Sequence, residues 1–181
     1  MKIAYQGIAG SYSESCAKHM FPEAETISCK TFDECFEKAN TDSSIKAIIP
    51  ESNKTTGNIG VEYLIFKYRL NIYDEFFFPI DHNLVGIKGS KLNDIKNVYS
   101  HAQALSQASR FIKENNYSAN VRADTAGSAK YVSEEKDKSK GAIASKLSAK
   151  IYNLEILKEK IQDDKDNYTR FLIMGKEIIQ P

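Results

Sequence analysis

The chain repeatedly passes from a short apolar run into a segment of helical periodicity, and this alternation limits the folds open to it. The apolar runs predict strands at residues 2–6, 26–29, 45–49, 97–99, 119–123 and 141–145. The periodic segments predict helices at residues 14–20, 31–39, 59–68, 102–113, 129–134 and 146–152. Such alternation is typical of α/β architecture, in which helices cover a sheet. We therefore predict an α/β fold, in which Pro50 ends the third strand.

Two extended runs in series, residues 72–80 and 82–87, indicate that the chain crosses from one lobe to another near Pro79. A polar stretch that begins at Asp163 then leads back to an apolar run at residues 171–174. A chain of 181 residues is long enough for two lobes with separate cores. We predict a first lobe of residues 1–79 plus 163–181, a second of residues 80–162, and a cleft between them.

Composition excludes several classes of function. Lys and Arg total 25 against 24 Asp and Glu, and the basic residues are scattered, so nucleic acid is not an expected partner. No apolar run approaches the length of a membrane span or a signal peptide, so we expect a cytoplasmic protein without a membrane partner. The three Cys and three His residues lack metal-ligand spacing, so we expect free thiols and no metal site.

The sequence DDKDNYTRFLIM at residues 163–174 has the pattern of a polar loop that enters a buried strand. Thr169 and Arg170 then lie at the mouth of that strand, where open α/β sheets bind small ligands. They are our candidate catalytic residues. The alternative from local pattern alone is that Thr169 is an ordinary strand residue and Arg170 a surface cation.

Other polar groups also lie where a strand passes into a helix. The turn at residues 7–13 places the amides of Gly10 and Ser11 at a helix start, which favours anions, although a plain turn is the alternative. Ser100 and His101 follow one strand and Thr125 another. For His101 a packing role is the alternative, and for Thr125 helix capping is favoured. We expect His82 to be a structural strand residue.

Six segments, taken in order, are similar to one enzyme family. They are YQGIAGSYS at residues 5–13, IPESNKTTGNIG at 49–60, SHAQALSQ at 100–107, DTAGSA at 124–129, GAIAS at 141–145 and NYTRF at 167–171. Together they resemble the catalytic portion of prephenate dehydratase. The resemblance implies a two-lobed fold like that of type II periplasmic binding proteins, with the active site in the cleft. It also implies conversion of prephenate to phenylpyruvate, carbon dioxide and water in phenylalanine synthesis, without metal or organic cofactor.

The resemblance also assigns the site. Thr169 would donate a hydrogen bond to the departing hydroxyl, and Arg170 would hold a carboxylate or lock the loop. The substrate-binding residues that it implies are Gly10, Ser11, Asn53, Ser100, His101, Gln107, Thr125 and Phe171.

The loop after Pro50 departs from the family pattern. With Pro50 and Gly57 aligned, Asn53 keeps the site asparagine, but Ser52 stands where the family has Glu and Lys54 where it has Ser. A local shift of one residue would return Glu51 to the acidic role. The sequence leaves both readings open.

Two other functions remain open at this stage, a non-catalytic anion-binding module and a decarboxylase that acts on prephenate without dehydration. Members of the family usually continue into an ACT domain that senses phenylalanine, and this chain stops near where that domain would begin. We therefore expect no phenylalanine inhibition of this chain alone. The family also implies a homodimer or a larger homo-oligomer.

Overall fold

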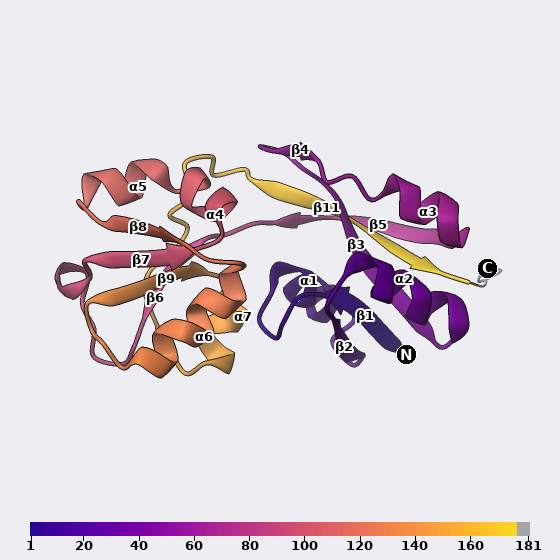
Figure 1. Ribbon diagram of the computed structural model, residues 1–181, viewed down its shortest axis with the longest axis horizontal. Helices are drawn as coiled ribbons and strands as arrows, with labels where there is room; N and C mark the ends of the chain where they lie inside the picture. The colour runs from indigo at the N-terminus through magenta and orange to yellow at the C-terminus, as the bar shows by residue number, and fades with distance from the viewer. Residues whose placement is uncertain (177–181) are drawn as a thin grey trace. The chain divides into compact units, whose positions relative to one another are not determined.

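The computed structural model describes residues 1–176 and divides them into two compact units (Figure 1). The first unit contains residues 1–8, 12–79 and 168–176, and the second contains residues 9–11 and 80–167. Residues 163–167, which the sequence predicts in the first lobe, belong to the second unit, because Asp163 makes its hydrogen bonds to residues of that unit. Its N–H donates to the carbonyl of Gln107 at 2.7 Å, and its carboxylate accepts from Ser109 Oγ at 2.9 Å. Residues 177–181 of the predicted first lobe lie outside the described residues.

The sheet of the first unit is mixed, with strand order β2-β1-β3-β11-β5 and β4 paired to β3. Its strands are β1 (Lys2–Gln6), β2 (Glu25–Cys29), β3 (Ile45–Asn53), β4 (Gly57–Asn58), β5 (Asn71–Pro79) and β11 (Tyr168–Gly175). β1 runs parallel to β2 and β3, whereas β11 is antiparallel to both β3 and β5. β11 is therefore an internal strand of the sheet, so Thr169 and Arg170 lie between β3 and β5.

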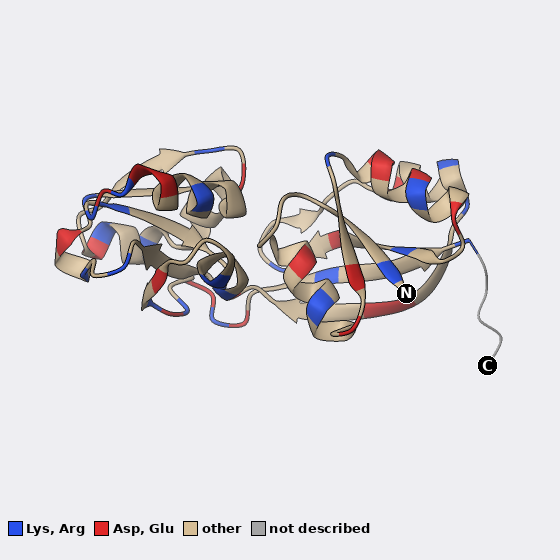
Figure 2. Ribbon diagram, turned by 90° about the horizontal axis from the view of Figure 1, so that it is seen from below, with Lys and Arg blue, Asp and Glu red and all other residues tan. Residues whose placement is uncertain are grey.

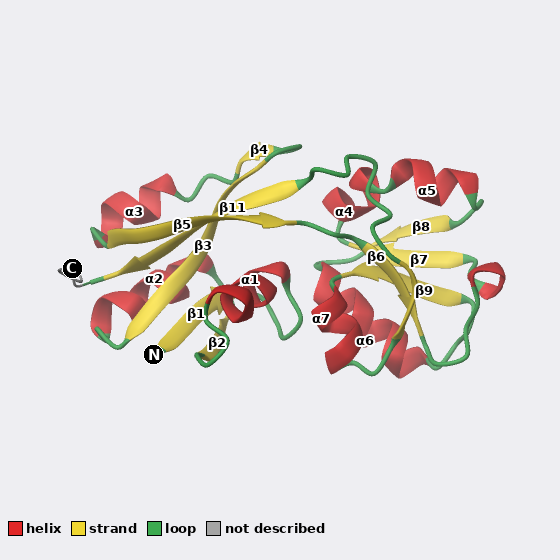
Figure 3. Ribbon diagram, turned by 180° about the vertical axis from the view of Figure 1, so that it is seen from behind, coloured by secondary structure: helices red, strands yellow, loops and turns green. Residues whose placement is uncertain are grey.

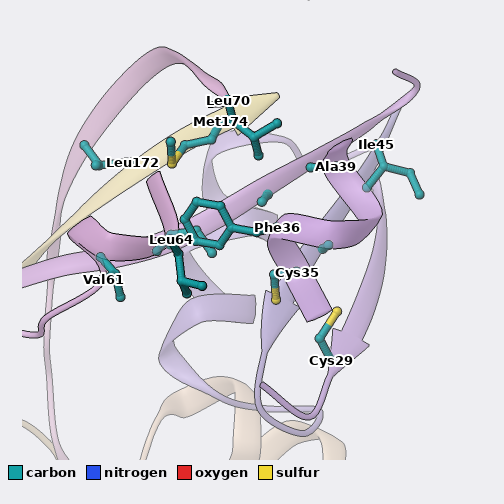
Figure 4. Close-up of a cluster of buried hydrophobic side chains, with 13 residues drawn as sticks. Cys29, Cys35, Phe36, Ala39, Ile45, Val61, Leu64, Leu70, Leu172 and Met174 are labelled. Atoms are coloured by element: carbon teal, nitrogen blue, oxygen red, sulfur yellow. The ribbon is translucent and has the colours of Figure 1, made fainter. Parts of the chain in front are cut away.

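Helices cover both faces of this sheet (Figure 3). They are α1 (Tyr12–Met20), α2 (Phe32–Thr41) and α3 (Glu62–Tyr68). α2 and α3 bury Phe36 and Leu64 against Leu172 and Met174 of β11 (Figure 4). The opposite face packs against α1, where Cys16 lies in one cluster with alternate residues of β1 and β11 and with Ile48 of β3. Strands β3 and β11 are therefore anchored by buried apolar side chains on both faces of the sheet.

β3 does not end at Pro50, as the sequence predicted, but continues to Asn53. Proline lacks an N–H group, so a central strand accepts it only at an irregularity. Here the register against β11 shifts at that point, since Arg170 pairs with Ser52 but Phe171 pairs with Pro50. Glu51 is the additional residue of a β-bulge, and the strand beyond it brings Asn53 opposite Thr169.

The second unit has a sheet of strand order β10-β6-β9-β7-β8, also covered on both faces. Its strands are β6 (Asn83–Gly86), β7 (Asn97–Ser100), β8 (Ser118–Val121), β9 (Lys140–Ala144) and β10 (Glu155–Lys158). Its helices are α4 (Ala102–Gln107), α5 (Ser109–Glu114), α6 (Thr125–Glu135) and α7 (Lys146–Ile151), with a 3₁₀ turn, η1, at Leu92–Asp94. α4 and α5 cover one face, and α6 and α7 the other (Figure 1).

The helix predicted over residues 102–113 is two helices, α4 and α5, that meet at Ala108. The break leaves the N–H of Arg110 directed at the carboxylate of Asp163, 3.2 Å away. A carboxylate at a helix start stabilises the unpaired N–H groups there. This long-range cap explains the break and places Gln107 at the end of α4.

Charged residues of both signs are interspersed over the described part of each unit (Figure 2). None of the helices within residues 1–176 has the length and hydropathy of a membrane span.

Candidate active site

Thr169 and Asn53 form a hydrogen-bonded pair in the first unit. Thr169 lies opposite Asn53 in the β3–β11 ladder, and the two side chains are 7% and 8% exposed. Nδ2 of Asn53 donates to Thr169 Oγ1 at 3.0 Å and to the carbonyl of Tyr168 at 2.9 Å. On the other side, Oδ1 of Asn53 accepts from the N–H and the hydroxyl of Thr55, at 2.9 and 2.8 Å. The orientation of the Asn53 amide is therefore fixed from both ends.

This pair decides what the Thr169 hydroxyl is able to do. A hydroxyl has one hydrogen to donate and lone pairs that accept. Since Asn53 donates to Oγ1, the hydroxyl hydrogen of Thr169 is directed to another acceptor. An accepted hydrogen bond also polarises the hydroxyl and strengthens it as a donor. This geometry leaves the hydroxyl hydrogen of Thr169 to be donated elsewhere, and the donor role toward a substrate that the resemblance implies stays a prediction.

Arg170 is held by carboxylates on both neighbouring strands. Its Nε donates to Glu75 at 2.7 Å, its Nη2 lies 2.5 Å from the same oxygen, and its Nη1 lies 3.3 Å from Glu51. Glu75 is a diagonal cross-strand neighbour on β5, because Arg170 pairs with Phe77. The hydrogen bond to Glu75 raises the pKa of Arg170 above its usual range, so the guanidinium stays charged. The two roles predicted for Arg170, holding a carboxylate or locking the Thr169 loop, stay predictions, and contacts to both neighbouring strands are what the locking role requires.

Glu51, in the segment after Pro50, contacts two neighbours. As the additional residue of the bulge, it accepts hydrogen bonds from both Ser52 Oγ, at 2.6 Å, and Arg170. Asn53 remains opposite Thr169. The bulge places the Glu51 carboxylate beside Arg170, and whether Glu51 takes the acidic role of the family stays a prediction.

Phe171 lies in the core rather than at a ligand-accessible surface. Its side chain is 1% exposed, and its ring packs edge-on against Phe78 with centroids 6.3 Å apart. We therefore assign Phe171 to packing, which corrects its prediction as a substrate-binding residue.

Six of the predicted site residues belong to the second unit: Gly10, Ser11, Ser100, His101, Gln107 and Thr125. Ser100 is fully buried at the end of β7, and its hydroxyl donates to the carbonyl of Ile143 at 2.7 Å. In this arrangement it offers a ligand only acceptor lone pairs. His101 caps α4, because its Nδ1 accepts from the N–H of Gln103 at 3.3 Å.

Thr125 begins α6, but the capping group is its neighbour. The carboxylate of Asp124 accepts from the N–H of Gly127 at 2.5 Å. The expectation that Thr125 itself caps the helix is therefore wrong. Asp124 was the stronger capping residue by type and stood directly before the helix.

Gly10 packs closely against α7. Its carbonyl accepts from the hydroxyls of Ser145 and Ser148 at 2.6 and 2.8 Å, and its φ is +94°. A Cβ at this position would lie 2.5 Å from Ser148 Oγ, so only glycine fits. The close packing accounts for this glycine, and anion binding by the Gly10 and Ser11 amides stays a prediction.

Gln107 lies in a buried polar cluster that sequence reasoning missed. Its Oε1 is 2.7 Å from Nε2 of His82 and 3.3 Å from Nδ2 of Asn167, and both partners are 2% exposed. Burial lowers the pKa of His82, against smaller opposing effects of Gln107 and Asp81, which favours the neutral ring. The polar sequence around Asn167 indicated that this residue lies near a site, but no local pattern indicated that His82 contacts Gln107.

The described residues contain no group of three or more His, Cys, Asp and Glu side chains that would hold a metal ion. Cys16, Cys29 and Cys35 are buried free thiols.

Comparison with known proteins identifies relatives along the whole chain. The sequence model described as prephenate dehydratase matches residues 3–178. The arogenate dehydratase/prephenate dehydratase 1 of Arabidopsis thaliana, described as chloroplastic, is 41% identical over 182 residues, which cover 100% of this chain and 46% of the relative. The chain thus spans about half the length of this curated relative.

Solved structures agree with the fold. A protein described as GqqA, a novel type of quorum-quenching acylase, has a TM-score of 0.92 and 31% identity, over 99% of this chain and 66% of that protein. The prephenate dehydratase of Arthrobacter aurescens, solved in complex with L-Phe, has a TM-score of 0.90 and 25% identity, over 100% of this chain and 62% of that one. These likenesses confirm the predicted α/β fold class. Since the family match spans nearly the whole chain, the chain belongs to the prephenate dehydratase family.

Proposed function

We propose that this chain catalyses the decarboxylating dehydration of prephenate to phenylpyruvate. The C–C bond to the ring carboxylate breaks and carbon dioxide leaves. Its electron pair completes the aromatic ring, while the C4–O bond breaks and the oxygen departs with its electrons. One proton on that oxygen then gives water. Formation of the aromatic ring supplies much of the driving force, so the protein must mainly position the substrate and assist the leaving hydroxyl.

The observation that carries this proposal is the hydrogen bond from Asn53 to Thr169 Oγ1. Because Oγ1 accepts from Asn53, the hydroxyl hydrogen of Thr169 is directed away from Asn53 and can be donated to a departing hydroxyl. A threonine hydroxyl is a weak acid, so Thr169 stabilises the oxygen by hydrogen bonding and passes on a proton that solvent replaces. We further propose Gln107 as a donor to a substrate carboxylate.

Arogenate is a second candidate substrate, because the Arabidopsis relative is named for both activities. Arogenate carries an amino group where prephenate carries a keto group, and the same bond changes convert it to phenylalanine. The ring chemistry at Thr169 is identical for both substrates. That relative is also named as chloroplastic, so the cytoplasmic location of this chain stays a prediction.

Product analysis tests the proposal. Purified protein is incubated with prephenate and, separately, with arogenate, and aromatic products and carbon dioxide are quantified. We expect phenylpyruvate and carbon dioxide in equal amounts, and phenylalanine in the second reaction if arogenate is also used. Carbon dioxide without an aromatic product would indicate a decarboxylase. Recovery of both substrates unchanged, with or without binding, would refute the proposal.

The role of Arg170 is tested by removing each of its carboxylate partners. We expect Glu75→Gln to lower kcat more than Glu51→Gln, because Glu75 makes the shorter contacts. These side chains are partly exposed, so each loss corresponds to less than about 1 kcal/mol, or under about fivefold in rate.

The Michaelis constant separates the two roles of Arg170. If Arg170 locks the strand beside Thr169, KM changes little in either variant while kcat falls. If instead KM falls, the released guanidinium binds a substrate carboxylate, and the locking role is wrong. Asp74→Asn on the same strand β5 is the matched control, since Asp74 pairs with Ile173 and is not a partner of Arg170 in the described structure.

A further inference from the structure

His82 is a buried histidine that the proposed chemistry does not use. It directly precedes β6 and is 2% exposed. Its backbone N–H donates to Oε1 of Gln162 at 3.0 Å, and its carbonyl accepts from the N–H of Ile161 at 2.8 Å. Gln162 is itself fixed, since its Nε2 donates to Asp81 at 2.9 Å. The backbone of His82 is therefore anchored independently of its ring.

The ring of His82 meets Gln107 at the short distance of 2.7 Å between Nε2 and Oε1. A carbonyl oxygen only accepts, so Nε2 carries the hydrogen in this contact. Asn167 Nδ2 lies 3.3 Å from the same oxygen as a second donor. If the Gln107 amide were flipped, its NH₂ group would face these two donors and neither would have an acceptor. The contacts thus define which end of the amide accepts and which end donates.

The main chain of Gln107 is fixed as well. Its carbonyl accepts from the N–H of Asp163 at 2.7 Å, and the helix breaks directly after it at Ala108. The backbone contacts therefore set the position of the Gln107 side chain, whereas other contacts set the orientation of its amide. His82 is one of the residues that orient the amide.

We propose that His82 is a positioning residue, whose Nε2–H group holds Gln107 Oε1 so that the Gln107 NH₂ group donates to a carboxylate of the substrate. This inference rests on the proposed function, in which Gln107 binds the substrate. Burial lowers the pKa of His82 and so favours the neutral ring, in which Nε2 carries the single hydrogen that this contact uses. Asp81 is the acidic neighbour, and its carboxylate is occupied by Gln162 and by Lys160, the latter at 3.5 Å.

A double-mutant cycle with Gln107 tests the proposal. His82→Leu removes the donor and is expected to lower kcat/KM by about 10- to 100-fold, because a misplaced substrate contact commonly has an effect of this size. The loss should appear mainly in KM, since the contact to a carboxylate exists before and during the reaction. In a Gln107→Ala background the same change should have almost no further effect. An equal loss in both backgrounds would overturn the proposal.

Two further variants separate positioning from packing. His82→Gln places an amide N–H near the position of Nε2 and should restore most of kcat/KM, whereas a purely structural role would leave it impaired. His19→Leu removes an exposed imidazole from the first unit and should leave kcat/KM unchanged. If His82→Gln is as impaired as His82→Leu although both are folded, the proposal is wrong.

A spectroscopic measurement keeps the inference separate from the proposed function. Long-range ¹H–¹⁵N spectra of histidine-labelled wild-type protein should show His82 as the neutral Nε2–H form. In protein labelled with ¹⁵N at glutamine, the Gln107 side-chain amide signals should shift in His82→Leu. An Nδ1–H form, or a Gln107 amide insensitive to His82, would overturn the positioning role whatever the activity. A wild-type chain with the expected spectra but no turnover of either substrate would instead refute the proposed function.

Discussion

Replacing Thr169 by alanine is expected to lower kcat by about 10²- to 10³-fold, the usual effect of removing one donor from a preorganised site. The Thr169 hydroxyl accepts from Asn53, and in the proposed reaction its hydrogen is donated to the departing oxygen. Without it the oxygen leaves as an unassisted hydroxide. Steady-state formation of phenylpyruvate, or of phenylalanine from arogenate, measures the loss. An undiminished rate in Thr169→Ala would refute the role assigned to this residue.

Matched variants distinguish chemistry from folding. Thr169→Val keeps the shape of the side chain and should be as slow as the alanine variant, whereas Thr169→Ser keeps the hydroxyl and should retain most of the rate. In both Thr169→Ala and Thr169→Val one hydrogen of Asn53 loses its partner, which costs about 1–3 kcal/mol of unfolding free energy. Thermal unfolding should therefore show a folded protein in every case. A slow Ser variant with normal stability would contradict a role for the hydroxyl itself.

Local sequence signals were sufficient for the architecture and for the mouth of β11. Alternating strands and helices predicted the α/β fold, and residues 2–6 form β1 as expected. The change from a polar loop to an apolar run located Thr169 and Arg170 at the start of β11. These features depend on residues close together in the chain, where periodicity and turn chemistry are informative.

Features set by distant partners were not predictable in the same way. Proline normally ends a central strand, but pairing with β11 carries β3 past Pro50 through a bulge. Helical periodicity continues through Ala108, but the Asp163 carboxylate favours a new helix start there. The contact of His82 with Gln107 spans 25 residues, and that of Asn167 with Gln107 spans 60. Tertiary contacts of this kind override local propensity.

Asn53→Asp is expected to lower kcat about as much as Thr169→Ala does, by about 10²- to 10³-fold. The change reverses a hydrogen bond without altering the shape of the side chain. A carboxylate only accepts. An aspartate at this position would therefore take the Thr169 hydroxyl hydrogen that the wild-type Asn53 amide directs away from itself. The same oxygen would also face the carbonyl of Tyr168, which now accepts from Nδ2. We expect the unfolding free energy to fall by about 1–3 kcal/mol, with the native fold retained.

The Asn53 prediction separates the donor hypothesis from a simple loss of anchoring. Asn71→Asp makes the same isosteric change in the same sheet, where Nδ2 donates to the carbonyl of Lys176, and should leave kcat close to wild type. If Asn53 acts by orienting Thr169, adding Thr169→Ala to Asn53→Asp should lower kcat little further, because both changes remove one donor. Multiplicative losses in the double variant would mean that Asn53 contributes independently of Thr169. A fully active Asn53→Asp enzyme would show that the direction of this hydrogen bond has no part in the reaction.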